Sequence, residues 1–151
     1  MVTSIQKYGI NTVRFPVTWM NFIDDQRNVD SEWTSRVKEV VDWGYNADLY
    51  VILNVQHDVV SVNSVSTGKS ALIKYKGLWK NIGTEFKHYV RRLVFENMNE
   101  VEYKNDYDYD TLLSFTQAFV EVVRVAGDKN ANTLLLISGA NTNVDLTCSD
   151  S

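Results

Sequence analysis

The sequence contains very few of the residues that cross-link or interrupt a chain, with one cysteine, Cys148, and one proline, Pro16. A single thiol excludes an internal disulfide and a cysteine-based zinc site. No apolar run approaches the length of a membrane span, so we expect no membrane partner. The first residues also lack an apolar core of signal-peptide length. An apolar fraction of 44% is that of an ordinary globular domain.

The charged fraction of 23% is ordinary, but the sequence has no long run of charges of one sign. The net charge is −4, and the basic residues form no stripe or patch, so we expect no nucleic-acid partner. Acidic residues alternate from Asp106 to Asp110, but Thr111 stands where an EF-hand calcium loop requires glycine. We therefore expect no metal and no cofactor. A nucleotide-binding open sheet is a distant alternative, because no predicted strand is followed by a glycine-rich phosphate loop.

Apolar runs alternate with amphipathic segments along the whole chain. The pattern predicts strands at 10–17, 49–55, 93–100 and 133–138, and helices at 30–45, 72–86 and 112–126. Asp30 and Asp110 are predicted to cap the first and third of these helices. Such an order predicts an α/β fold with a parallel sheet and right-handed crossovers. We expect one domain over residues 1–151, which is too short for a closed eight-stranded barrel of about 250 residues.

Polar side chains stand at the ends of the predicted strands, and in a parallel sheet these ends converge on one rim. Each residue alone is often structural, as an ion-pair partner or a solvated side chain, but their joint placement favours a site. Glu96 lies about 13 Å of backbone before Glu100 and is expected to be a buried partner of Arg14. The strand-end residues are Arg14, Gln56, His57, Asp58, Asn99, Glu100 and Asn141.

Three segments that contain these residues resemble the family 5 glycoside hydrolases, the family of cellulases and related β-glucanases. They are Val13-Arg14-Phe15-Pro16, Asn54-Val55-Gln56-His57-Asp58 and Phe95-Glu96-Asn97-Met98-Asn99-Glu100. The resemblance implies a TIM-type (β/α)8 barrel, of which this chain holds about four strands, roughly the second to the fifth. It also implies a cellulose-like β-glucan polysaccharide or oligosaccharide as substrate, and an extracellular location.

The resemblance further implies a role for each matched residue. Glu100 corresponds to the catalytic general acid/base, and Asn99 to the residue that bonds the sugar 2-hydroxyl. Arg14 corresponds to the arginine that orients the nucleophile. Gln56 and His57 occupy the position of a substrate-contacting histidine pair, in which Gln56 replaces the first imidazole.

A second carboxylate is the missing part of the machinery. Glycoside hydrolysis needs two carboxyl groups, about 5 to 5.5 Å apart for retention and about 6.5 to 9.5 Å for inversion. The family's nucleophile comes from a later strand, and nothing after Asn141 matches it. The candidates are Asp58, Asp145 and an acid from a second subunit, although the ordinary interpretation of Asp58 and Asp145 is an exposed loop carboxylate.

Two functional hypotheses remain open. The first is a truncated or minimal endo-β-1,4-glucanase that carries Glu100 and whose open strand edges pair with another copy in a homo-oligomer. The second is a catalytically silent half barrel that only binds glucan or serves as a folding and assembly module.

Overall fold

The computed structural model describes residues 2–56, 68–89, 91–99 and 106–139. Within these ranges, four strands alternate with long helices in the predicted order. The strands are β1 (Thr12–Val17), β2 (Tyr50–Val55), β3 (Leu93–Glu96) and β4 (Leu134–Leu136). The helices longer than one turn are α2 (Ser31–Asn46), α3 (Gly68–Glu85) and α4 (Asp106–Val125). The short helices are α1 (Val2–Ile5), η1 (Gln6–Tyr8), η2 (Met20–Phe22) and η4 (Asp128–Asn132).

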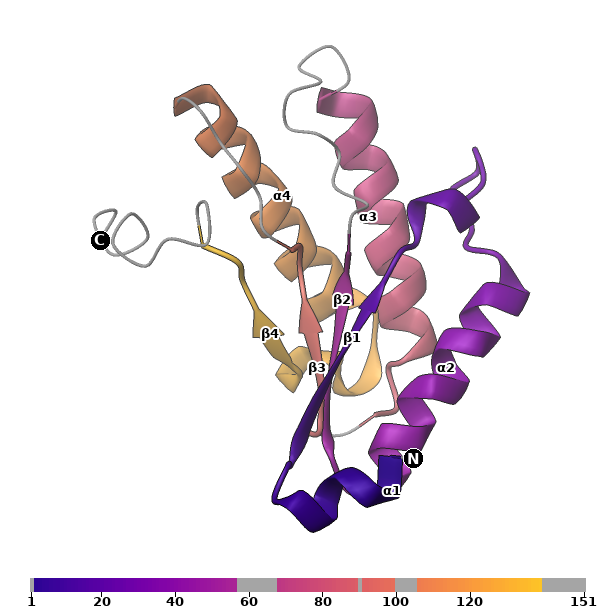
Figure 1. The fold of residues 1–151 in the computed structure, drawn as a ribbon. Coiled ribbons are helices and arrows are strands. Elements are labelled where there is room, and N and C mark those ends of the chain that lie inside the picture. The colour runs from indigo at the N-terminus through magenta and orange to yellow at the C-terminus, as the bar shows by residue number, and fades with distance from the viewer. Residues whose placement is uncertain (1, 57–67, 90, 100–105, 140–151) are drawn as a thin grey trace.

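The four strands form one parallel sheet in the order β1-β2-β3-β4, which confirms the predicted βα repeat. Their arrows all point towards the same end in Figure 1. Strands β1, β2 and β4 begin one or two residues later than predicted. Strands β3 and β4 end earlier than predicted, at Glu96 and Leu136. The residues beyond those ends include Asn97, Asn99 and Ser138, and they form hydrogen bonds through their side chains and irregular backbone, so they leave the regular ladder.

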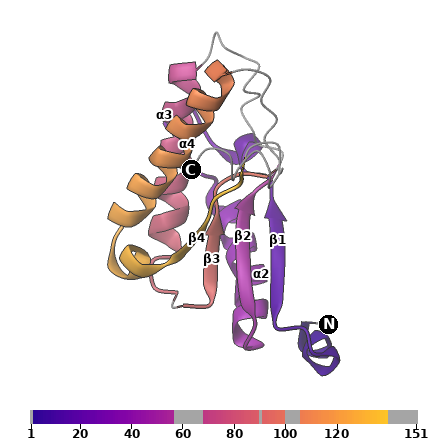
Figure 2. The ribbon, with the colours of Figure 1, turned by 90° about the vertical axis from the view of Figure 1, so that its left-hand side faces the viewer.

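The long helices cover one face of the sheet, as the two perpendicular views show (Figures 1 and 2). Alternate strand residues point into this layer and are buried, as in Val51, Leu53 and Val55 of β2. Trp79 of α3 lies at the centre, with its ring centroid 4.4 Å from that of Phe119 and 5.8 Å from that of Phe95. The core therefore lies between the sheet and the helices.

The two predicted helix caps have different outcomes. Asp30 caps α2 as predicted, because its side chain accepts a hydrogen bond from the Trp33 backbone N–H at 2.8 Å. The predicted cap at Asp110 is wrong, since α4 already begins at Asp106 and Asp110 lies inside it. Acidic residues are favourable throughout the first turn of a helix as well as at its cap, so this acidic run left the start ambiguous.

The opposite face of the sheet carries exposed apolar side chains. Tyr50 of β2 and Leu134 and Leu136 of β4 are 45%, 59% and 43% exposed, and none of them faces the helices. The sheet also has two open edges, at β1 and β4. No helix in the described part of the chain is both long and apolar enough to cross a membrane.

Candidate active site

Arg14 and Glu96 form a two-pronged ion pair across the exposed face of the sheet. Arg14 Nε donates to Glu96 Oε2, and Arg14 Nη2 donates to Glu96 Oε1, both at 2.7 Å. The pair spans β2, because β1 and β3 are both neighbours of that strand. The Arg14 side chain is 37% exposed and that of Glu96 only 13%. The predicted partnership is thereby confirmed, with Glu96 the more buried member.

Arg14 differs from expectation in its position along the strand. It is the third residue of β1 and pairs with Ile52 in the middle of β2, so it does not stand at a strand end. Its long side chain reaches the rim instead. The same Nη2 atom that bonds Glu96 donates to Asn99 Oδ1 at 2.9 Å, three residues beyond the end of β3. Arg14 and Asn99 are therefore brought together as predicted.

Gln56 is held at the adjacent strand end by the buried side chain of Asn54. Asn54 Nδ2 donates to Gln56 Oε1 at 3.0 Å, while Asn54 Oδ1 accepts from the Val17 backbone N–H at 3.3 Å. The backbone carbonyl of Asn54 also accepts a hydrogen bond from Trp19 Nε1. These bonds fix the carboxyl ends of β1 and β2 to each other, so Gln56 lies at the rim on a rigid support.

Asn97 is an important residue that the sequence reasoning missed. It is fully buried, and its Oδ1 accepts hydrogen bonds from the backbone N–H groups of Met98 at 2.8 Å and Ser138 at 3.0 Å. Its Nδ2 donates to Thr116 Oγ1 of α4 at 3.3 Å. An amide inside an apolar strand that ends in polar residues was the available signal. Asn97 supports the backbone from which Asn99 projects.

Tyr75 of α3 completes the support below this strand end. Its hydroxyl donates to the Asn97 backbone carbonyl at 3.0 Å. Burial raises the pKa of the Tyr75 phenol far above its ordinary value, so the group stays neutral and remains a donor. The turn after β3 is thus anchored to α3, α4 and the start of the segment after β4.

Several predicted site residues lie outside the described residues. They are Glu100, His57, Asp58, Asn141 and Asp145. Their predicted positions at the rim therefore stay predictions. Within the described ranges, no three residues among histidine, cysteine, aspartate and glutamate are grouped as a metal ion would require.

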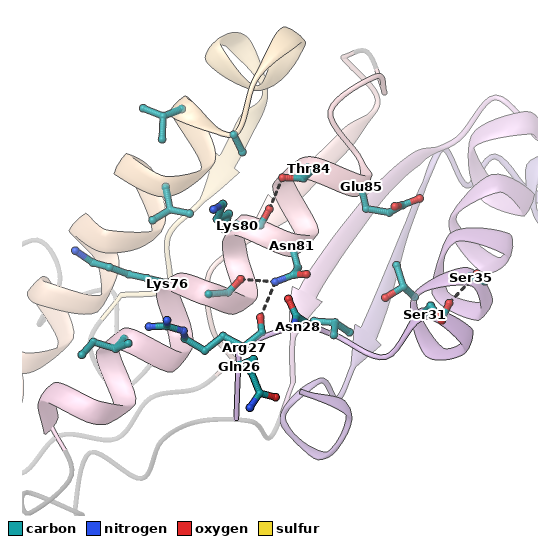
Figure 3. Close-up of a pocket in the computed structure, with 17 residues that line it drawn as sticks. Gln26, Arg27, Asn28, Ser31, Ser35, Lys76, Lys80, Asn81, Thr84 and Glu85 are labelled. Atoms are coloured by element: carbon teal, nitrogen blue, oxygen red, sulfur yellow. Dashed lines mark hydrogen bonds between the residues drawn. The ribbon is translucent and has the colours of Figure 1, made fainter. Parts of the chain in front are cut away.

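A separate groove of about 970 Å³ lies on the outer, helical side of the molecule (Figure 3). Its walls come from residues 26–29, α2, α3 and the end of α4, and it contains none of the strand-end residues. Asn81 Nδ2 donates to the carbonyls of Arg27 and Gly77, both at 2.8 Å, and so ties the loop to α3. The groove is a packing feature between helices, distinct from the rim.

The sequence matches a family model over residues 1–150, and that model is Cellulase (glycosyl hydrolase family 5). Endoglucanase A of Paenibacillus barcinonensis is 36% identical over 162 residues, in an alignment that covers 97% of this chain and 40% of the relative. The chain therefore spans about two fifths of the length of this relative.

Solved structures agree with this match. A GH5-4 broad specificity endoglucanase from an uncultured bovine rumen ciliate has 60% identity and a TM-score of 0.88, and the match covers 97% of this chain and 42% of that one. A family 5 enzyme from Prevotella bryantii, solved with a xyloglucan tetradecasaccharide, has 32% identity and a TM-score of 0.86 over 93% of this chain and 44% of its own. Because these neighbours are TIM barrels, the likeness confirms the predicted partial barrel. The chain belongs to the cellulase family, glycosyl hydrolase family 5.

Proposed function

We propose that this chain forms part of the active site of a glycoside hydrolase that cleaves β-1,4-glucosidic bonds in cellulose-like glucans. The observation that carries the proposal is the contact of Arg14 with both Glu96 and Asn99, directly before Glu100 in the sequence. A charged, hydrogen-bonded group at the carboxyl ends of parallel strands is the usual position of catalytic machinery in such folds. The family match supports the same reaction class.

Each residue has a defined role in the proposed chemistry. Glu100 protonates the glycosidic oxygen as the bond breaks and later removes a proton from the attacking water. Asn99 bonds the sugar 2-hydroxyl, a contact that strengthens in the transition state of glycoside hydrolysis. Arg14 supplies a fixed positive charge that orients the nucleophilic carboxylate. Gln56 and His57 contact the substrate beside them.

The second carboxylate is proposed to come from Asp58, Asp145 or a second copy of the chain. A second copy would also cover the exposed apolar face that includes Tyr50, Leu134 and Leu136. The open edges of β1 and β4 offer unpaired backbone groups for the same contact. We therefore propose a homo-oligomer through these edges. Since polymeric β-glucan lies outside cells, the proposed place of action is extracellular.

Release of reducing sugar from soluble cellulose tests the catalytic proposal. The wild-type chain is expected to release sugar, and Glu100→Gln is expected to lose most of the rate, because the amide transfers no proton. Glu39→Gln is the matched control, since Glu39 is an exposed acid on α2 that bonds Arg36 at the surface. Equal rates for wild type and Glu100→Gln would remove Glu100 from the mechanism. No release by wild type would favour the silent, glucan-binding half barrel.

Light scattering coupled to size-exclusion chromatography tests the oligomer. Wild type is expected to elute as a dimer or larger species, and Leu136→Lys is expected to shift it towards the monomer by placing a charge on the exposed sheet face. Ile73→Lys is the control, because Ile73 is similarly exposed, at 50%, but lies on the outer side of α3. A wild-type monomer at all concentrations would contradict this part of the proposal.

A further inference from the structure

Glu96 stands outside the roles proposed above, although it makes the strongest contact in the described site. It is a carboxylate with a 13% exposed side chain, and its two oxygens are both occupied by Arg14. A parallel pair of charged hydrogen bonds fixes the plane of a guanidinium as well as its position. Glu96 therefore constrains the directions in which the other N–H groups of Arg14 point.

The orientation of the Asn99 amide follows from the chemistry of arginine. A guanidinium has five N–H donors and no acceptor, so the Asn99 atom that faces Arg14 Nη2 at 2.9 Å must be the oxygen. The NH₂ group of Asn99 then occupies the other branch of the amide. Among the described residues, none accepts a hydrogen bond from that NH₂ group. Asn99 consequently presents a donor, and not an acceptor, to whatever binds at the rim.

We propose that Glu96 is a positioning residue that acts through Arg14 to lock the Asn99 amide with its NH₂ group towards the substrate. The chain of contacts runs from Glu96 Oε1 to Arg14 Nη2 at 2.7 Å and from Arg14 Nη2 to Asn99 Oδ1 at 2.9 Å. Without Glu96 the guanidinium loses the two hydrogen bonds that fix its plane, and we expect the Asn99 amide then to sample both orientations. Only one of these orientations donates a hydrogen bond to a sugar oxygen.

The contact with the sugar is therefore one in which the protein donates the hydrogen bond. The kinetic test of Glu96 described below rests on the proposed function. The Asn99 NH₂ group donates to the 2-hydroxyl oxygen, which leaves that hydroxyl free to donate elsewhere as charge develops at the neighbouring carbon. A misoriented amide turns its carbonyl towards the hydroxyl oxygen. Small losses of orientation in a catalytic site lower rates by up to about 100-fold.

Nuclear magnetic resonance tests the lock without any need for activity. In ¹⁵N-labelled protein, the side-chain NH₂ signals of Asn99 are identified by their loss in Asn99→Asp. In wild type we expect a rigid NH₂ group with a high heteronuclear NOE. In Glu96→Gln, which offers Arg14 one acceptor oxygen in place of two, we expect the NOE to fall. Glu39→Gln is expected to leave it unchanged. An Asn99 group that stays as rigid in Glu96→Gln as in wild type would overturn the proposal.

Kinetic measurements then distinguish a positioning role of Glu96 from a general loss of structure in the site. On an aryl β-cellobioside, Glu96→Gln is expected to lose about 10- to 100-fold in kcat with little change in KM. On the analogue that lacks the 2-hydroxyl at the cleaved sugar, the loss is expected to be less than about 3-fold, because the contact is already absent. An equal loss on both substrates would contradict action through Asn99. If wild type cleaves neither substrate, the proposed function fails and the NMR result alone decides the role of Glu96.

Discussion

The side-chain oxygen of Asn97 accepts a hydrogen bond from the Ser138 backbone N–H at 3.0 Å. The bond joins the turn after β3 to the segment after β4, where the regular ladder has already ended at Leu136. In the other direction, the Asn97 backbone N–H donates to the Leu136 carbonyl at 3.1 Å. One buried amide thus continues the pairing of two strands beyond their last ladder residues and holds the rim in place.

Asn97→Ala is expected to destabilise the fold by about 2 to 4 kcal/mol, because it leaves the buried backbone donor of Met98 and the partly buried one of Ser138 without their acceptor. The free energy of unfolding from urea titration measures the effect. Asn132→Ala is the control, since Asn132 is exposed at the end of η4. Substitutions of exposed residues such as this one change the free energy of unfolding by no more than about 0.5 kcal/mol. A similarly small effect for Asn97→Ala would contradict its supporting role.

Much of the fold was predictable from the sequence because burial on both faces leaves a clear signal. Continuous apolar runs such as Val51 to Leu53 predicted the central strand, and helical spacing predicted α2 to α4. The Arg14–Glu96 pair was also predictable, since Glu96 lies too far along its strand from Glu100 to act as the second carboxylate. These inferences depend on periodicity and chain geometry, which a single sequence contains.

Other features depend on contacts between distant segments, which the local sequence does not specify. Asn97 was indistinguishable from its polar neighbours Asn99 and Glu100, because only the fold shows that its amide turns inward to bond Ser138 and Thr116. Arg14 was wrongly predicted to stand at a strand end. It lies in the middle of its strand, and its long side chain reaches the rim. The acidic residues before α4 fit a cap and a first helical turn equally well, so its start was misplaced.

Tyr75→Phe is expected to lower stability by about 1 kcal/mol at neutral pH, because the Asn97 carbonyl loses its hydroxyl donor. It is also expected to change the response to alkali. Burial raises the pKa of Tyr75 in the folded state, while an unfolded tyrosine ionises near pH 10, so the unfolded state releases the proton first. This contribution to stability is fully present below about pH 10 and is lost as the pH rises above it.

Urea titrations between pH 8 and about pH 11 check both effects. Tyr75→Phe is expected to flatten the fall in stability above about pH 10, although Tyr89, whose pKa is also raised by burial, leaves a residual slope. Tyr8→Phe is the control because Tyr8 is 84% exposed. An alkaline slope in Tyr75→Phe as steep as that of wild type would mean that the Tyr75 phenol does not titrate differently in the two states.

Gly44→Ala tests how closely α2 packs on the sheet. In an ordinary helix interior this change stabilises by about 0.5 to 1 kcal/mol. At Gly44, however, an added Cβ would lie 2.8 Å from Val51 Cγ2 and 3.2 Å from Val13 Cγ2. Both valines belong to the strands that the helix covers, and the nearer one, Val51, is fully buried, so its side chain has no space to move away. We therefore expect a net loss of about 1 to 3 kcal/mol from overpacking.

Thermal and urea unfolding of Gly44→Ala measure the sign of this effect. Ser70→Ala is the matched control, because Ser70 is exposed on α3 and the change tests helix propensity alone. The control is expected to be neutral or slightly stabilising, within about 0.5 kcal/mol. A stabilised Gly44→Ala would show that α2 can move away from β1 and β2 at little cost. The strands that carry Arg14 and Asn54 would then rest on a looser support than the close contact at Gly44 indicates.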